Sequence, residues 1–323
     1  MPRRLVSSTR SQILRMTAAE LKSSIRASEG RVVLAQAHVS IPSMISNVMG
    51  VEILQAFGAD MIFLNGYSLD PATTNIGLVA EEFDEQAGDY RPKTYRARDL
   101  RRLINVPLGV YLECGAGDDA ATSTTSKAQV KADRVASPEN LQRVLDEGFD
   151  FIVLGGNPGT RTRIETIIEN TRLAKQILGD RVLIMAGKWE DGVYEKVLGD
   201  PLARLDSKDV ATQLLEAGAD AITMPMPGGR PGITPDNIRE LIEHIHRTDE
   251  NALALTFLDS SVEGSDVDTV RQITLMSRVA GADIHAIGDA GLGGIAVPED
   301  LMQLSMTVKG RRLTWLRLAI GAR

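Results

Sequence analysis

The tetrapeptide Ala217-Gly218-Ala219-Asp220 stands directly before the apolar run 221–224, and it is the clearest sign of how this chain folds. Close variants occur at 57–60 (FGAD), 147–150 (EGFD) and 280–283 (AGAD), each followed by another short β-rich run. An amphipathic stretch precedes every copy, and glycine is the usual residue just past the end of a helix. The four copies therefore predict four helix–turn–strand units.

Four further apolar runs lie between these units and complete a regular pattern. They begin at residues 32, 108, 182 and 253, so they recur every 71 to 76 residues, and helical periodicity follows each one. Eight short strands alternating with eight helices predict an α/β fold, a (βα)8 TIM barrel. A doubly wound open sheet shows the same alternation, but no dinucleotide-binding glycine signature follows the first run, which favours the barrel.

The whole chain, 1–323, is expected to be one barrel domain. Residues 1–30 form an N-terminal extension with an extra helix at 17–28 that is expected to close the bottom of the barrel, and 31–323 form the barrel itself. The eight barrel helices are predicted at 46–57, 93–104, 138–147, 161–178, 208–217, 235–246, 267–279 and 298–319.

Composition excludes several classes of protein. Hydrophobic residues make up 43% and charged residues 24% of the chain, as in ordinary globular proteins, which excludes a disordered or fibrous chain. The net charge of −7 lacks the basic excess of nucleic-acid binders, so no nucleic-acid partner is expected. No membrane partner is expected either, because no apolar run reaches about 18 residues. With Cys114 as the single cysteine, we expect no intrachain disulfide and a cytoplasmic protein.

Loop lengths indicate which end of the barrel carries function. The loops after the second, third and fifth predicted strands, 66–92, 115–132 and 188–206, are long, whereas the Gly-Ala-Asp turns at the other end are short. The second is acidic, and the third is rich in small residues, which is typical of a mobile lid. The functional face is therefore predicted at the carboxyl ends of the strands.

Polar residues follow nearly every predicted strand at that end. In the run 108–113, alternation turns Leu108, Val110 and Leu112 toward the helices and Glu113 toward the barrel axis. The candidate catalytic residues are Glu113, Lys188, Glu190, Asp259 and His38, and the candidate substrate-binding residues are Asn65, Asn157, Asp289 and Arg230.

The segment Ile287-Gly288-Asp289-Ala290-Gly291-Leu292-Gly293-Gly294 is the sharpest local motif. Backbone N–H groups in glycine-rich turns converge on anions, and the last βα loops of this fold often bind phosphate. We therefore predict a phosphate site at Gly288, Gly291, Gly293 and Gly294. The alternative is a tight glycine-rich turn that binds nothing.

A metal or a covalent intermediate is left open. Glu113, Asp259 and Asp289 carry the oxygen ligands that suit a divalent cation such as Mg²⁺, whereas nothing resembles a zinc site. Lys188 is interpreted as a partner of a phosphate or carboxylate group, with Schiff-base chemistry as the less favoured alternative.

The predicted C-terminal helix carries basic and apolar residues side by side, among them Lys309, Arg311, Arg312, Trp315 and Arg317. A helix that binds a membrane surface or nucleic acid is one interpretation. The favoured one is an apolar face that closes the barrel or contacts another subunit, with basic edges in solvent. A homo-oligomer is accordingly expected.

Two stretches, GVEILQAFGADMIFLNG (50–66) and VPLGVYLECGAG (106–117), resemble the first third of the phosphoenolpyruvate mutase and isocitrate lyase barrels. IGDAGLGG (287–294) is similar to the phosphate-binding end of ribulose-phosphate-type barrels. The whole chain resembles a poorly characterised bacterial family of such barrels. The Lys-x-Cys-Gly motif of the mutases is missing, so the resemblance implies the fold and phosphate handling but no reaction.

These features predict an enzyme that acts on a small phosphorylated metabolite, a sugar phosphate above all. Isomerisation, epimerisation or C–C cleavage would use Glu113 or Asp259 as the base, with Lys188 or His38 polarising a carbonyl group. One alternative is a hydrolase of phosphorylated glycosides with a carboxylate pair drawn from Glu113, Glu190 and Asp259. The other is a non-catalytic barrel that binds a phosphorylated ligand.

Overall fold

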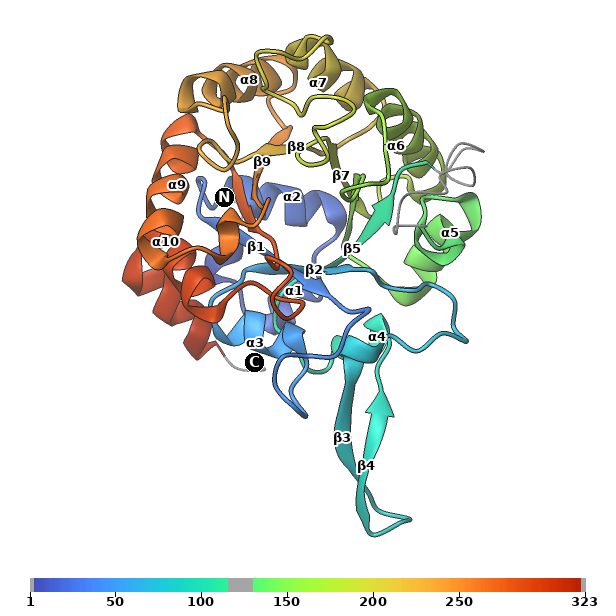
Figure 1. Cartoon of the computed structure of the whole chain (residues 1–323). Helices are drawn as coiled ribbons and strands as arrows, with labels where there is room; N and C mark the ends of the chain where they lie inside the picture. The colour runs from blue at the N-terminus through green and yellow to red at the C-terminus, as the bar shows by residue number, and fades with distance from the viewer. Residues whose placement is uncertain (1–2, 116–129, 321–323) are drawn as a thin grey trace.

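The computed structural model describes residues 3–115 and 130–320, and within them eight parallel strands form a closed barrel (Figure 1). β1 pairs with both β2 and β10, so the ring of strands has no free edge. This confirms the predicted TIM barrel and excludes the open sheet. The barrel strands are β1 Val32–His38, β2 Met61–Asn65, β5 Leu108–Glu113, β6 Phe151–Gly155, β7 Leu183–Gly187, β8 Ala221–Pro225, β9 Leu253–Leu258 and β10 Ile284–Ile287.

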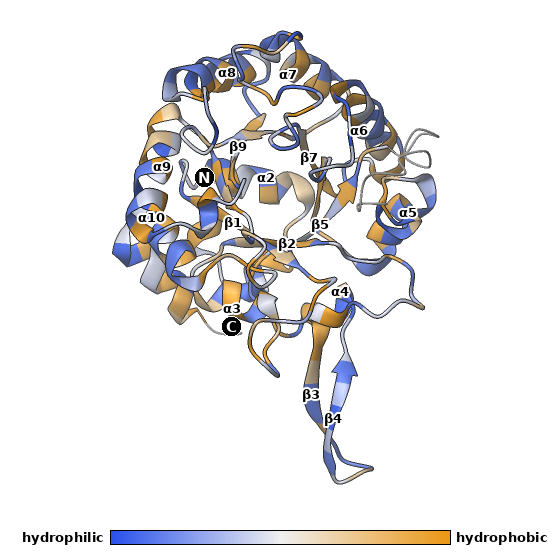
Figure 2. Ribbon diagram, in the orientation of Figure 1, coloured by the Kyte–Doolittle hydropathy of each residue, from blue (hydrophilic) through white to orange (hydrophobic). Residues whose placement is uncertain are grey.

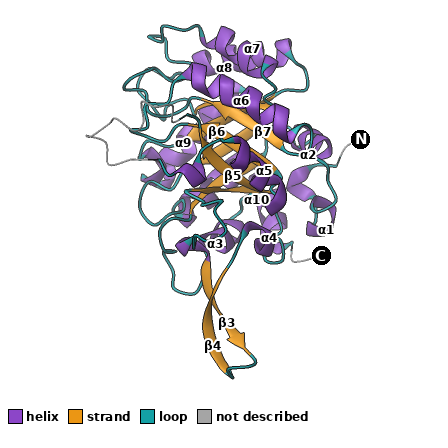
Figure 3. Cartoon of the chain, turned by 90° about the vertical axis from the view of Figure 1, so that its right-hand side faces the viewer, coloured by secondary structure: helices purple, strands orange, loops and turns teal. Residues whose placement is uncertain are grey.

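Helices surround the barrel in the predicted alternation (Figures 1 and 3). Three of them are shorter than predicted. The helix expected at 46–57 begins only at Gly50, and the one expected at 161–178 begins only at Ile164. The one expected at 93–104 is reduced to a single turn, and 93–94 belong to a strand. The helices are α3 Gly50–Ala56, α4 Ala97–Leu100, α5 Pro138–Glu147, α6 Ile164–Leu178, α7 Ser207–Glu216, α8 Pro235–Thr248, α9 Val267–Ala280 and α10 Pro298–Ala319.

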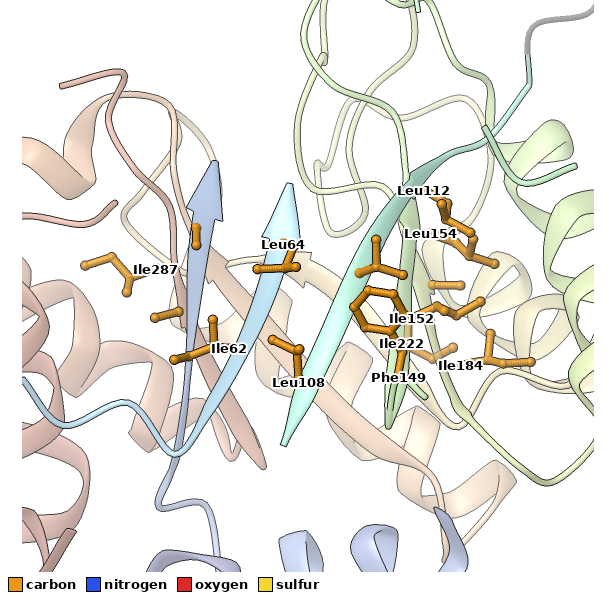
Figure 4. Close-up of a cluster of buried hydrophobic side chains, with 14 of the residues drawn as sticks. Ile62, Leu64, Leu108, Leu112, Phe149, Ile152, Leu154, Ile184, Ile222 and Ile287 are labelled. Atoms are coloured by element: carbon orange, nitrogen blue, oxygen red, sulfur yellow. The ribbon is translucent and has the colours of Figure 1, made fainter. Parts of the chain in front are cut away.

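Two buried layers hold the barrel together, because successive side chains of a strand point to opposite faces. Leu108, Val110 and Leu112 of β5 pack in the layer between strands and helices, part of which Figure 4 shows. Tyr111 packs in the layer inside the barrel. The predicted orientation of β5 is therefore confirmed, and hydrophobic residues concentrate on the central strands (Figure 2).

The N-terminal helix α2 (Ala18–Arg26) contributes to the inner layer. Its Leu21 and Ile25 are buried in the same cluster as the inward-facing side chains of the strands. A Thr17 N-cap accepts the Glu20 N–H at 3.2 Å and fixes the start of this helix. The expected packing of this extra helix against the barrel interior is therefore present, and the short α1 (Arg10–Ile13) precedes it.

The aspartate of each repeated tetrapeptide precedes one barrel strand and forms hydrogen bonds with the start of the barrel strand before it. Its carboxylate accepts the backbone N–H of the first or second residue of the preceding barrel strand, at 2.8 to 3.0 Å. Its own N–H donates to the carbonyl of that same residue, at 2.7 to 2.9 Å. The four pairs are Asp60 with Val33, Asp150 with Leu108, Asp220 with Ile184, and Asp283 with Ala254. The repeat therefore recurs because it satisfies strand N–H groups at the barrel bottom.

The C-terminal helix α10 supplies two cations to the first of these aspartates. Lys309 Nζ lies 2.6 Å and Arg317 Nε 3.0 Å from the carboxylate of Asp60, and all three side chains are buried. Burial lowers the pKa of Lys309 to about 8. The expectation that these two residues line basic solvent edges is therefore wrong. No helix in the described ranges is long and apolar enough to cross a membrane.

An antiparallel hairpin lies where the sequence predicted a loop. β3 (Val79–Asp84) pairs with β4 (Asp89–Thr94) and projects away from the barrel beyond α4 (Figures 1 and 3). The long acidic loop predicted at 66–92 therefore contains most of a β-hairpin that the sequence did not predict. The predicted lid at 115–132 falls mostly on 116–129, which lie outside the described residues.

Candidate active site

A cavity of about 310 Å³ opens at the carboxyl ends of β1, β2, β5 and β6. Four of the predicted site residues line it, one from the end of each of these strands: His38, Asn65, Glu113 and Asn157. The remaining lining residues are Gly66, Tyr111, Val130, Lys131, Arg134 and Thr160. The cavity therefore lies at the end of the barrel where the sequence placed the functional face.

Glu113 is the carboxylate of this cavity, and it is only 5% exposed. Its Oε2 accepts the Asn157 backbone N–H at 3.0 Å and the Tyr111 hydroxyl at 3.4 Å, and its Oε1 accepts the Asn157 side-chain amide. Burial raises the pKa of Glu113 to about 7, and these hydrogen bonds oppose the rise. A carboxylate with a pKa near neutrality can both take up and release a proton at physiological pH.

His38 lies at the end of β1 beside the glycine-rich loop. The backbone N–H of His38 donates to the carbonyl of Gly294 at 2.6 Å, and the ring Nδ1 of His38 is 3.3 Å from Ser40 Oγ. Burial lowers the pKa of His38, and the charge of Arg134 lowers it further, although Asp289 opposes both. A neutral imidazole therefore faces the cavity, suited to donate or accept one hydrogen bond to a substrate.

Two cations line the cavity that sequence reasoning missed, Lys131 and Arg134. Arg134 ends a single helical turn, Ala132–Arg134, which Asn140 fixes by donating to the carbonyls of Ala132 and Val135 at 2.8 and 2.9 Å. The Arg134 Nε is buried and has no hydrogen-bond partner within the described ranges. A buried guanidinium N–H without a partner is costly, so an anionic ligand at this position would stabilise it.

A second group lies at the ends of β7, β8 and β9. It consists of three predicted catalytic residues, Lys188, Glu190 and Asp259, and the predicted substrate-binding residue Arg230. Arg230 Nη2 lies 3.3 Å from Asp259 Oδ1, and Lys188 Nζ donates to the Thr162 carbonyl at 2.8 Å. Burial raises the pKa of Asp259 to about 6. Burial, together with the charges of Asp259 and Glu113, raises the pKa of Glu190 well above its usual value. Burial lowers the pKa of Lys188. None of these four residues lines the 310 Å³ cavity.

Trp189 belongs to an aromatic layer inside the barrel. Its ring stacks on Phe257 with centroids 5.2 Å apart and meets Tyr111 edge-on at 6.0 Å. It is 2% exposed, and a Cβ added at Gly155 would come 2.6 Å from it, so this glycine makes room for the indole. The aromatic layer forms the floor beneath both groups of polar residues.

The glycine-rich loop 288–294 contains the predicted phosphate site, which stays a prediction. Part of its backbone is already bonded: Gly288 N–H donates to the Leu258 carbonyl at 2.9 Å, and Ala290 N–H donates to Glu263 Oε1 at 3.0 Å. Glu263, 4% exposed, is a further carboxylate that sequence reasoning missed, and burial raises its pKa to about 7. Gly294 has φ +79° and lies so close to the His38 carbonyl that a Cβ would be 2.8 Å away.

The described part of the chain contains no preformed magnesium site. No group of three or more His, Cys, Asp and Glu side chains there is arranged to hold a metal ion. Of the three predicted ligands, Glu113 is bonded to Asn157, Asp259 to Arg230, and Asp289 accepts Gln36 Nε2 at 3.0 Å. These residues do not fit a shared cation, so we derive no chemistry through one.

Fold and site together define a (βα)8 barrel with a polar cavity at the carboxyl ends of its strands. Over residues 6–323 the chain matches a family model described as "Domain of unknown function (DUF7916)", and it belongs to that family. A search of the curated proteins found no match.

Among solved structures, the chain is similar to the carboxyl transferase domain of Rhizobium etli pyruvate carboxylase with 3-hydroxypyruvate, at a TM-score of 0.51 and 14% identity. That match covers 96% of this chain and 52% of the other, so this chain spans about half the length of that protein. A 2,3-dimethylmalate lyase of the PEP mutase/isocitrate lyase superfamily matches at a TM-score of 0.48 and 12% identity, covering 86% of this chain and 82% of that one. At these identities the likeness shows the fold alone.

Proposed function

We propose that this protein is an enzyme that transfers a proton on a small anionic metabolite, in the manner of an isomerase, epimerase or lyase, with Glu113 as the base. The observation that carries the proposal is the position of Glu113. Its carboxylate is buried, has a pKa of about 7, and lines a cavity that also holds Lys131 and Arg134. A general base works best when its pKa lies near the operating pH.

The anionic group of the substrate pairs with Arg134 and Lys131 in this proposal. Both a phosphate and a carboxylate can bind the Arg134 guanidinium in a bidentate manner, and its Nε has no hydrogen-bond partner among the described residues. A sugar phosphate or a small carboxylate metabolite is therefore the expected substrate. The similar carboxyl transferase domain of pyruvate carboxylase was solved with 3-hydroxypyruvate, a small carboxylate.

The other lining residues orient the substrate and receive the charge that develops. Neutral His38 donates a hydrogen bond to a carbonyl oxygen as electron density accumulates there. The amides of Asn65 and Asn157 bind hydroxyl or carbonyl groups, and Asn157 also holds the base through its backbone N–H. Each step uses this chain's own groups: Glu113 takes the proton, His38 stabilises the enolate oxygen, and Arg134 holds the distant anion.

A turnover screen tests the proposal. Wild-type protein is incubated with two panels, phosphorylated sugars and unphosphorylated small carboxylates, and the products are followed by mass spectrometry and NMR. Glu113→Gln keeps the size of the side chain but removes the base. Glu169→Gln is the matched control, because Glu169 is exposed and lies on α6 outside the cavity.

The expected result is turnover of at least one compound, a loss of about a hundredfold or more in Glu113→Gln, and wild-type rates in Glu169→Gln. The panel that supplies the substrate decides between phosphate and carboxylate. Binding without any turnover would contradict the proposal and favour the non-catalytic barrel.

A further inference from the structure

Lys188 follows β7 directly and belongs to the second group of polar residues. The sequence predicted it as a partner of a phosphate or carboxylate group. In the structure it is 3% exposed and does not line the 310 Å³ cavity, and its Nζ donates to the main-chain carbonyl of Thr162 at 2.8 Å. The ammonium group of Lys188 therefore binds another loop of the protein.

Thr162 lies in the loop 156–163, which joins β6 to α6. The loop that follows β7 binds this loop at two neighbouring points. Lys188 donates to Thr162, and the backbone N–H of Arg161 donates to Asp191 Oδ2 at 3.2 Å. The end of loop 156–163 is therefore held in place from the neighbouring βα unit.

The backbone conformation of Arg161 agrees with such a constraint. Its φ of +58° lies in the left-handed region, which is uncommon for a residue other than glycine, asparagine or aspartate. Residues in this region persist where surrounding contacts fix them, and they are found most often at functional sites. The bonds from Lys188 and Asp191 are contacts of this kind.

The start of the same loop binds the carboxylate of Glu113. The backbone N–H of Asn157 donates to Oε2 at 3.0 Å, and the Asn157 side-chain amide donates to Oε1. Thr162 lies against Gly156, the residue before Asn157, because a Cβ added at Gly156 would come 2.2 Å from Thr162 Cβ. Thr162 therefore packs beside the peptide group whose N–H binds Glu113.

Two hydroxyl groups connect Thr162 with the carbonyl of Asn157. The Thr160 hydroxyl donates to this carbonyl at 2.8 Å, and Thr160 Oγ1 lies 2.9 Å from Thr162 Oγ1. A hydroxyl group has one proton to donate, so Thr162 is the donor in the second bond. The main-chain N–H and the carbonyl of Asn157 therefore both have fixed partners.

We propose that Lys188 is a positioning residue, which orients the carboxylate of Glu113 through loop 156–163 without touching the substrate. Lys188 holds Thr162, and Thr162 holds Asn157 by its contact with Gly156 and through the Thr160 hydroxyl. The proposal rests on the proposed function, in which Glu113 is the base. It adds a connection between the second group of polar residues and that base.

The pKa of Glu113 reports on this connection. The hydrogen bonds from Asn157 stabilise the ionised carboxylate and oppose the rise in pKa that burial causes, so the pKa of Glu113 rises further when Asn157 loses its alignment. Other titratable or charged groups face Glu113 as well. They are Tyr111, Cys114, Glu190 and Asp191, together with His38, Lys131 and Arg134 of the cavity lining. The variants described next leave all of them in place.

Carbon NMR of protein labelled with ¹³C at the glutamate carboxyl carbons measures this pKa, and the spectrum of Glu113→Gln assigns the Glu113 signal. Lys188→Met removes the ammonium group and keeps a long unbranched side chain. Lys196→Met is its matched control, because Lys196 is an exposed lysine of the same loop.

A second pair of variants separates the hydrogen-bond chain from the charge of Lys188. This separation is needed because Lys188 also interacts with the charges of Glu190, Asp191, Glu195 and Arg230. Thr160→Val removes the hydroxyl group that binds Asn157 and changes no charge. Thr160→Ser keeps that hydroxyl group and is the matched control.

We expect the pKa of Glu113 to rise by about 0.5 to 1 in Lys188→Met and in Thr160→Val, the effect of one weakened hydrogen bond. Thr160→Ser and Lys196→Met should keep the wild-type value. An unchanged pKa in either Lys188→Met or Thr160→Val would overturn the positioning role, even if the melting temperature fell. If Thr160→Val alone were unchanged, Lys188 would act through its charge.

The same titration distinguishes this proposal from the proposed function. A pKa of Glu113 near 4.5 in the wild type would contradict its role as the base. The positioning role depends instead on the difference between Thr160→Val and Thr160→Ser, which the titration measures whatever the wild-type value is.

Discussion

Replacing Glu113 by glutamine should change the pH dependence of stability as well as activity. In the folded protein the pKa of Glu113 is raised from 4.5 to about 7, chiefly by burial. Between these two pH values the folded protein keeps a proton that the unfolded chain has released. The free energy of unfolding of the wild type therefore falls as the pH rises from 4.5 to 7, and the loss is complete above pH 7.

The size of this loss follows from the shift in pKa. One pKa unit corresponds to 1.36 kcal/mol, so a carboxyl group whose pKa rises from 4.5 to about 7 costs about 3 kcal/mol when ionised. The glutamine side chain of the Glu113→Gln variant has no such titration. Its amide also finds partners, since the Asn157 side chain can turn over and accept from it while Asn65, 3.3 Å from Asn157, turns in concert.

Urea unfolding at pH 4.5 and at pH 8 measures this difference. Between pH 4.5 and pH 8, we expect the free energy of unfolding of Glu113→Gln to rise by about 3 kcal/mol relative to that of the wild type. The kcat of Glu113→Gln should be about a hundredfold or more below that of the wild type. Glu169→Gln should show neither effect. A gap between Glu113→Gln and wild type that stays constant with pH would refute a buried carboxylate with a raised pKa, and with it the proposed base.

Three further variants test other parts of the structure. Arg134→Leu should raise KM for the anionic substrate by about ten- to a hundredfold, the value of one charge-assisted hydrogen bond, with a melting temperature near that of the wild type; an unchanged KM would remove Arg134 from the binding site. Asp60→Asn should lower the free energy of unfolding by about 3–5 kcal/mol in urea, because it leaves two buried cations unpaired, whereas Asp220→Asn, whose ion pair is half-buried, should cost about 1 kcal/mol or less; equal costs would contradict the buried triad. Gly293→Val should weaken the binding of phosphorylated ligands in calorimetry and leave the barrel intact, since its Cβ would meet only the Met44 segment at the surface, 3.0 Å from Met44 Cβ, and that segment would shift by a few tenths of an ångström; unchanged affinity would show that the glycine-rich loop binds no phosphate.

The sequence predicted the barrel well because local signals repeat there. The Gly-x-Asp turn recurs four times, and the structure shows why: each aspartate caps a strand N–H at the barrel bottom. The residue at the end of each strand lies at the barrel mouth, and this rule predicted Glu113 and His38 as site residues. The fold and the end of the barrel that carries the cavity therefore follow from periodicity and turn chemistry alone.

Features that depend on contacts between residues far apart in the sequence could not be predicted from local patterns. Arg134 follows no strand, and its position depends on hydrogen bonds to the start of α5. Helical periodicity in α10 gives no sign that Lys309 meets Asp60, about 250 residues earlier in the chain. The hairpin was missed because its strands are charged and contain Pro92, a composition typical of a solvated loop or of an exposed edge strand.

Deuterium exchange into substrate tests the central claim, that Glu113 removes a proton from a small anionic metabolite. Each panel compound is incubated with the protein in D₂O, and the proton NMR signal of each C–H next to a carbonyl group is followed. We predict that the wild type replaces such a proton by deuterium in at least one compound, that Glu113→Gln does so about a hundredfold more slowly or worse, and that Glu169→Gln matches the wild type. Exchange at the wild-type rate in Glu113→Gln, or no exchange in any compound of either panel, would contradict the account.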